Sequence, residues 1–136
     1  MRVLFFTCCE GAAIDQITNR LSIFNVLEEV QAVGMPLFIQ QLVIVVMLHR
    51  MEEEPEQPNF TIRATLAGKQ LFDLPAQIAF QKHLRTRATI QIQGMVIPGP
   101  GSVRFELKDG ENALAYWDLI VTAIAPPQIQ AVGAPA

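Results

Sequence analysis

The chain has 136 residues, carries a formal net charge of −3, and is 51% hydrophobic but only 17% charged. This composition excludes disorder for most of the chain, because the apolar residues suffice to offset the entropy lost on folding. It also excludes general nucleic-acid binding, which needs a basic field. The longest apolar run, Leu42–Leu48, is far too short to cross a bilayer. We therefore expect one folded domain with no nucleic-acid partner and no membrane partner.

The first segment, MRVLFFTCCEGAA, imitates a signal peptide, with Arg2 before a short apolar patch. The patch is shorter than the apolar core of a signal peptide, so we expect an N-terminal edge strand. Cys8 and Cys9 are adjacent, and adjacent strand residues point to opposite faces. We predict one core thiol and one more exposed thiol, without a disulfide or a zinc site. Reduced cysteines favour a cytoplasmic location.

The segment from Ala12 to Pro36 fits two shapes. Apolar residues recur three or four apart, as on one helix face, at Ile14, Ile17, Leu21, Phe24, Leu27 and Val30. RLSIF instead alternates, as in a half-buried strand with Leu21 and Ile23 inward. Asn25 weakens a helix centre, and Asn19 can adopt the left-handed conformation of a turn. We predict a strand from Arg20 to about Val30, entered through a turn at Asn19, with a helix as the alternative.

The next segment, Pro36–Met51, is apolar on both faces around LVIVVML, as in a central strand covered on each side. It is long for one strand and has a candidate bend at Gln40-Gln41. EEEPEQPN is an acidic, proline-broken loop. FTIRATL alternates as a strand, and AGK forms a hairpin turn.

The last third of the chain continues this pattern. RATIQIQG alternates with Ala88, Ile90 and Ile92 on one face. SVRFELKDGENALAYWDLIVTAI is a hairpin closed at Asp-Gly, with a bulge expected around Tyr116-Trp117. We predict an all-β antiparallel sandwich of about seven to nine strands over residues 1–124, immunoglobulin- or C2-like. Residues 125–136 are predicted to form a flexible Pro/Ala-rich tail.

The segments AIDQITNRLSIFNVLEEV, MPLFIQQLVIVVML and GMVIPGPGSVRFELKDGENALAYWDLIV, in this order, resemble a family of small bacterial domains catalogued only as a domain of unknown function. The resemblance covers residues 3–124 and implies an immunoglobulin- or C2-like sandwich. It implies no activity and no catalytic residues. Asn25 stands where that family usually has a glycine, Cys8-Cys9 replace a more polar stretch, and the tail after Ile124 is extra, so the resemblance implies no shared partner.

Candidate chemistry is sparse. His49, Glu52 and Glu54 could in principle ligate a metal, but no second well-spaced histidine accompanies them. Charge runs without ligand spacing are usually solvated, so we predict no catalytic residue, metal or cofactor.

Two surface features remain. Lys82, Arg85 and Arg87 form the one basic cluster, which either binds an acidic partner or solvates an exposed sheet face. Tyr116 and Trp117 are aromatics at the edge of the core, with a smaller chance of forming a contact site. We take these five residues as the possible interaction surface.

We therefore expect a non-catalytic, cytoplasmic β-sandwich that self-associates or docks on another protein. The alternatives are a subunit of a larger assembly, such as a filament, phage-like or secretion structure, and a metal-dependent ligand binder or enzyme using His49 and the acidic loop.

Overall fold

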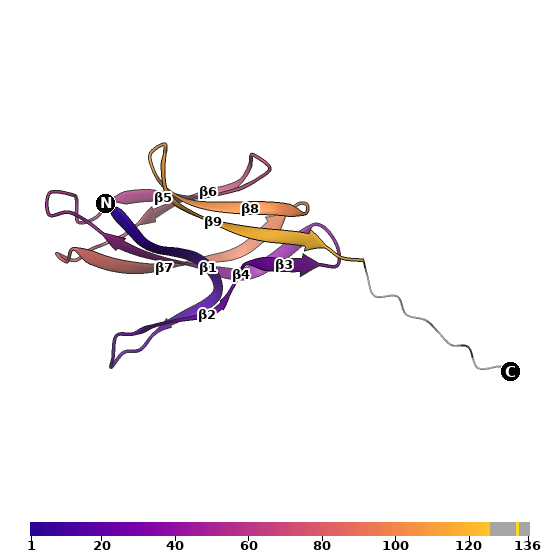
Figure 1. Cartoon of the computed structure of the whole chain (residues 1–136), viewed down its shortest axis with the longest axis horizontal. Coiled ribbons are helices and arrows are strands. Elements are labelled where there is room, and N and C mark those ends of the chain that lie inside the picture. Colours follow the sequence, from indigo (N-terminus) through magenta and orange to yellow (C-terminus); the bar gives the residue numbers. More distant parts are fainter. Residues whose placement is uncertain (126–132, 134–136) are drawn as a thin grey trace.

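The computed structural model describes residues 1–125 and 133 of the chain. Two sheets pack face to face, and no helix occurs in the described residues, so none there could span a membrane (Figure 1). The strands are β1 (Arg2–Ile14), β2 (Leu21–Val26), β3 (Glu29–Ala32), β4 (Leu37–His49), β5 (Asn59–Leu66), β6 (Lys69–Gln77), β7 (Arg85–Ile97), β8 (Gly101–Asp109) and β9 (Asn112–Ala123). The all-β sandwich predicted from the sequence is confirmed.

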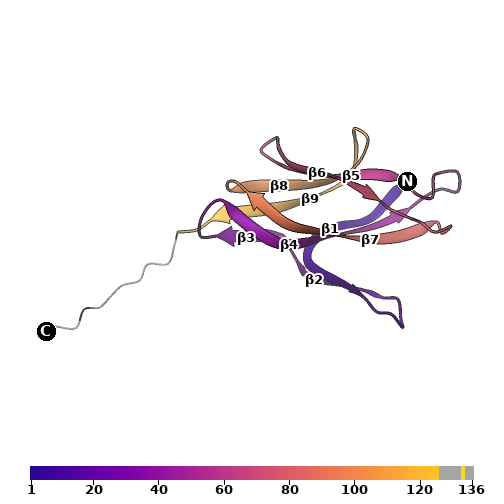
Figure 2. The ribbon, with the colours of Figure 1, turned by 180° about the vertical axis from the view of Figure 1, so that it is seen from behind.

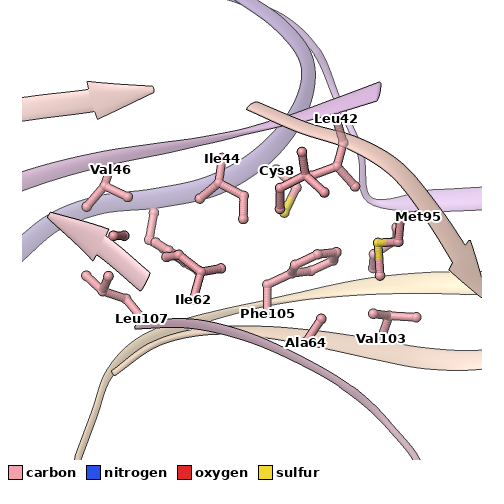
Figure 3. Packing of buried hydrophobic residues seen from close by; sticks show 14 of the residues in the cluster. Cys8, Leu42, Ile44, Val46, Ile62, Ala64, Met95, Val103, Phe105 and Leu107 are labelled. Atoms are coloured by element: carbon pink, nitrogen blue, oxygen red, sulfur yellow. The ribbon is translucent and has the colours of Figure 1, made fainter. Parts of the chain in front are cut away.

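One sheet has the strand order β2-β1-β4-β7 and the other the order β3-β9-β8-β5-β6. All neighbouring strands are antiparallel except β3 and β9, which are parallel. The inward residues of the two sheets meet in one core, where Ile44 and Leu42 face Ile62 and Phe105 (Figure 3). Strict alternation places these residues inward, because successive strand side chains point to opposite faces.

Strand β4 is covered on both of its faces, as its apolar run predicts. Leu42, Ile44 and Val46 point into the sandwich, whereas Val43 and Val45 point outward and are nevertheless buried. The cover on the outer face is the hairpin of β1 and β2, which leaves the layer of β4 and β7 and forms a partial third layer (Figures 1 and 2).

Strand β1 pairs with two different strands along its length, and the second pairing forms the hairpin. Its residues up to Cys9 pair with β4, and those from Cys9 onward pair with β2. Leu21 and Ile23 of β2, with Ala12, then pack against the outward residues of β4. The expected N-terminal edge strand is therefore correct only for the first half of β1.

The hairpin turn depends on two short polar residues, Asp15 and Asn19. Asp15 Oδ1 accepts the amides of Ile17 and Thr18, each at 2.8 Å, and these hydrogen bonds lower the pKa of the carboxyl. Asn19 has a φ of 58°, the left-handed conformation predicted for it. The turn therefore forms from local hydrogen bonds, while Leu21 and Ile23 in the following strand are partly buried.

The segment that fitted either a helix or a strand is extended, so the strand prediction is confirmed. The prediction of one strand from Arg20 to Val30 is wrong, because the segment divides into β2 and β3, which lie in different sheets. Asn25, with a φ of 55°, and the link at Leu27 carry the chain between them. The Leu27 amide donates to the Cys8 carbonyl at 2.9 Å, and Trp117 Nε1 donates to the Leu27 carbonyl at 2.9 Å.

The two cysteines point to opposite faces, as predicted. Cys8 lies in the sandwich core and Cys9 lies under the hairpin, so both are fully buried. The prediction that one thiol is more exposed is wrong, because the sequence alone does not show that the outer face of β1 is covered. Burial raises the pKa of both thiols.

Local irregularities lie near their predicted positions. In β4 the inward side chains are Leu37 and Ile39 before Gln40-Gln41 and Leu42 after them, so the alternation shifts by one residue there. The alternation of the paired strand β7 shifts by one residue at Gly94, which has a φ of 78°. The bulge of β9 lies at Leu114, slightly before the predicted Tyr116-Trp117. The predicted tail lies almost wholly outside the described residues.

The hairpin cover generates a prediction about thiol reactivity. In a Cys8→Ser background, Ile23→Ala should raise the rate of Cys9 alkylation about tenfold or more, because losing apolar contacts worth about 1.4 kcal/mol changes the local opening equilibrium by that factor. The measurement is labelling by a maleimide followed by mass spectrometry.

Phe24→Ala is the matched control, because Phe24 lies on the same strand but is exposed. It should leave the Cys9 rate unchanged, and Cys8 should stay protected from labelling in a Cys9→Ser, Ile23→Ala protein. Rapid labelling of Cys9 without any hairpin substitution would contradict the conclusion that the hairpin shields Cys9.

Candidate interaction surface

The structure divides the five residues of the expected interaction surface between separate places. Arg85 and Arg87 point outward from β7, because the even-numbered residues Ala88, Ile90 and Ile92 of that strand contact the core. Lys82 is exposed in the loop before β7. Tyr116 points outward from β9 in the other sheet, and Trp117 points inward against the core. Tyr116 therefore lies on the opposite outer face of the sandwich from Arg85 and Arg87, and Trp117 lies on neither face.

Tyr116 belongs to a cluster within its own sheet. The Arg104 guanidinium lies 4.0 Å from the centre of the Tyr116 ring and donates to both carboxylate oxygens of Asp118, at 2.9 and 3.0 Å. The hydrogen bonds from Arg104 to Asp118 raise the pKa of Arg104. Arg104 and Asp118 are direct cross-strand partners, so this cluster stabilises the pairing of β8 with β9.

Arg50 is a structural residue that the sequence analysis missed. Its side chain is buried at the start of the acidic loop, where Nε donates to the His83 carbonyl at 2.9 Å and Nη1 donates to the Glu54 carbonyl at 3.2 Å. Its guanidinium also lies 5.6 Å from the centre of the Phe80 ring. The loop after β4 is thus folded around a buried cation, and the only sequence signal was an arginine between an apolar strand and an acidic run.

The hypothetical metal ligands do not come together. Glu54 Oε1 accepts the Met1 amino group at 2.6 Å and the Met51 amide at 2.9 Å, and these hydrogen bonds lower its pKa. The cross-strand partners of His49 are Arg2 and Arg85. Within the described part of the chain, no group of three or more histidine, cysteine, aspartate or glutamate residues is placed to hold a metal ion.

The first half of β4 has one free edge. Residues 37–41 pair with β7 on one side, but β1 joins β4 only from Val43 onward. Beside this free edge lies a hollow of about 590 Å³, bounded by Glu10, Leu27 and Val30 as well as by residues 37–41. The departure of β1 into the hairpin therefore leaves a position beside β4 where a further strand could pair.

An exposed apolar pair adjoins this edge. Phe38 is 62% exposed and Val96, its partner on β7, is 54% exposed. A Cβ at Gly94 would lie only 3.7 Å from the Phe38 ring, so the ring lies over this glycine. The outer face at this end of the sheet is thus apolar and uncovered, in contrast to the end under the hairpin.

Several of the other outer edges carry features that discourage pairing. Strand β6 contains Pro75, which lacks an amide donor, β3 has only four residues and begins with Glu29, and β7 carries Arg85 and Arg87. The first half of β1 has a bulge at Leu4. The free edge of β4 has none of these features.

A family model matches most of the chain. A model described as a family of unknown function (DUF6941) matches residues 4–122 of the chain. No curated protein matches. The match includes all or most of every strand of both sheets.

The buried cation at Arg50 generates a prediction about stability. Arg50→Ala should lower the free energy of unfolding by about 3 kcal/mol, because it leaves several partly buried carbonyl groups without donors and removes the buried guanidinium from beside the Phe80 ring. Arg50→Lys should recover only part of this loss, since an ammonium group cannot reproduce the fork of the guanidinium. Urea unfolding followed by circular dichroism measures both.

Lys69→Ala, at the exposed start of β6, is the control for the loss of one positive charge and should change the free energy of unfolding by no more than about 0.5 kcal/mol. An Arg50→Ala protein as stable as the Lys69→Ala protein would refute the structural role of Arg50.

Proposed function

The chain belongs to the DUF6941 family of unknown function, and we propose that it is a non-catalytic interaction module that self-associates. In this proposal the free edge of β4 pairs with the same edge of a second copy in antiparallel orientation. The two β2-β1-β4-β7 sheets then join through residues 37–41.

The observation that carries the proposal is the unpaired backbone at this edge. Apart from the bonds to β7, no backbone hydrogen bond of residues 37–41 is found among the described residues. Backbone amides and carbonyls need partners, and an unprotected edge is a template for another strand.

The absence of charged residues at this edge of β4 supports a second copy of the chain as the strand that pairs with it. Residues 37–41 are Leu-Phe-Ile-Gln-Gln, so two such edges can meet without opposing like charges. Pairing of two β7 edges centred at Thr86 would place Arg85 opposite Arg87, which is destabilising. Glu10 at the rim of the hollow is held by the Asn25 amide at 3.0 Å.

The apolar residues at this end support the same contact. Antiparallel pairing centred at Ile39 places Phe38 of each copy opposite Gln40 of the other. The exposed rings and the Val96 side chains would then lie on one continuous sheet face, where apolar surface is removed from water. Pairing of identical edges is closed by its two-fold symmetry, which favours a dimer over an open filament.

The proposal includes the cellular setting expected from the sequence. Both cysteines are free and buried, which suits a reducing compartment, and we infer a bacterial cytoplasmic protein with an immunoglobulin- or C2-like sandwich. The other occupant that the edge would accept is an extended, uncharged segment of a different protein.

The test is the mass in solution, measured by size-exclusion chromatography with light scattering. The unaltered chain should run as a dimer of the 15.1 kDa protomer. Gln40→Lys should weaken the dimer about tenfold or more, because it places a charge opposite the exposed Phe38 ring of the other copy and makes the two lysines diagonal neighbours across the paired edges. Gln70→Lys, an exposed substitution on β6, is the matched control and should remain dimeric.

A monomer at all accessible concentrations would refute self-association. A dimer that is equally stable in the Gln40→Lys protein would place the interface elsewhere and refute the β4 edge.

A further inference from the structure

We propose that the outer face of the sheet β2-β1-β4-β7 carries a binding site for a small phosphate-class anion with more than one phosphoryl group. The site consists of Arg2, His49 and Arg85, with Arg87 beside them. It lies at the opposite end of β4 from the proposed dimer edge, about 30 Å away along the strand, and is independent of it.

Three adjacent strands bring these residues into one row. His49 of β4 is the direct cross-strand partner of Arg2 on β1 and of Arg85 on β7. Directly opposed residues in an antiparallel pair share a face, and neighbouring strands lie about 4.8 Å apart. The two arginine backbones are therefore about 10 Å apart, with the imidazole between them.

The row faces outward and is hollowed. Leu48 beside His49 is fully buried in the core, so alternation directs His49 to the outer face. One hollow of about 290 Å³ is lined by Met1, Arg2, His49, Met51 and Arg85. A second hollow of about 410 Å³ contains Arg85 and Arg87 and is bounded by Asn19 at the hairpin turn. Arg85 is common to both hollows.

The side chains of the site lack acidic partners within the described residues. Arg50, Arg63 and Arg104 each have a carboxylate within salt-bridge distance, whereas none of the four residues of the site has one. Arg87 instead donates from Nη2 to Asn19 Oδ1 at 2.8 Å, which fixes its guanidinium beside the hairpin turn. Uncompensated cations thus gather at one place in a chain whose net charge is −3.

This arrangement selects the ligand class. Guanidinium groups present paired N–H donors that match phosphate oxygens. Two such groups flanking an imidazole suit an anion that extends over two phosphoryl groups better than a single carboxylate. The negative net charge disfavours a long polyanion such as a nucleic acid, and the hairpin bounds the site on one side.

Isothermal titration calorimetry of the full chain with inorganic pyrophosphate at low ionic strength tests the site. Arg85→Ala should weaken binding about tenfold or more and Arg2→Ala by several-fold, because each removes charge-assisted hydrogen bonds. Added sodium chloride should weaken binding, as for exposed charges. Lys69→Ala, in the other sheet, should change the affinity by less than about twofold.

Absence of pyrophosphate binding would overturn the proposal, as would an equal loss in the Lys69→Ala and Arg85→Ala proteins. Citrate binding as tightly as pyrophosphate would overturn the assignment to phosphates, whereas weaker binding of citrate and orthophosphate would support it. Both arginine positions are exposed, and unchanged circular dichroism spectra would show that the variants remain folded.

Discussion

The structure depends on the way β1 leaves β4 after Cys9. Up to that residue β1 is an ordinary member of the sandwich, and beyond it the same strand pairs with β2 and lies across the outer face of the sheet. This buries Val43 and Val45, which would otherwise leave an apolar outer face in water. The high apolar content and low charge of the chain follow from the burial of both faces of β4.

The same departure creates the open end of the molecule. Because β1 turns outward, residues 37–41 of β4 keep a free edge, and the link through Leu27 crosses from one sheet to the other beside it. The hydrogen bond from Trp117 to Leu27 fixes this link against β9. The departure of β1 from β4 therefore both covers part of the outer face of β4 and leaves the edge of residues 37–41 free. The proposed dimer edge and the proposed anion site lie at opposite ends of β4.

Much of the fold was predictable from local patterns. The alternation of Val103, Phe105 and Leu107 and the Asp-Gly turn after them each determine a structure over a few residues, and each is observed. Asn19 and the phase change at Gln40-Gln41 were found for the same reason, since a turn or a change of phase appears directly in the sequence. The family resemblance agreed with these patterns, and the family match covers the same strands.

The candidate sites were not predictable in this way. Arg85 and Arg87 were identified, but Arg2 and His49 join them only through cross-strand register, which no local pattern contains. The sequence by itself determined that the chain forms strands, which residues of each strand face the same way, and where most turns lie, because these follow from side-chain alternation and backbone preference. Only the tertiary structure decided which faces are covered and which edges stay open, since Cys9 and Val43 are buried by a hairpin whose position depends on contacts distant in the sequence.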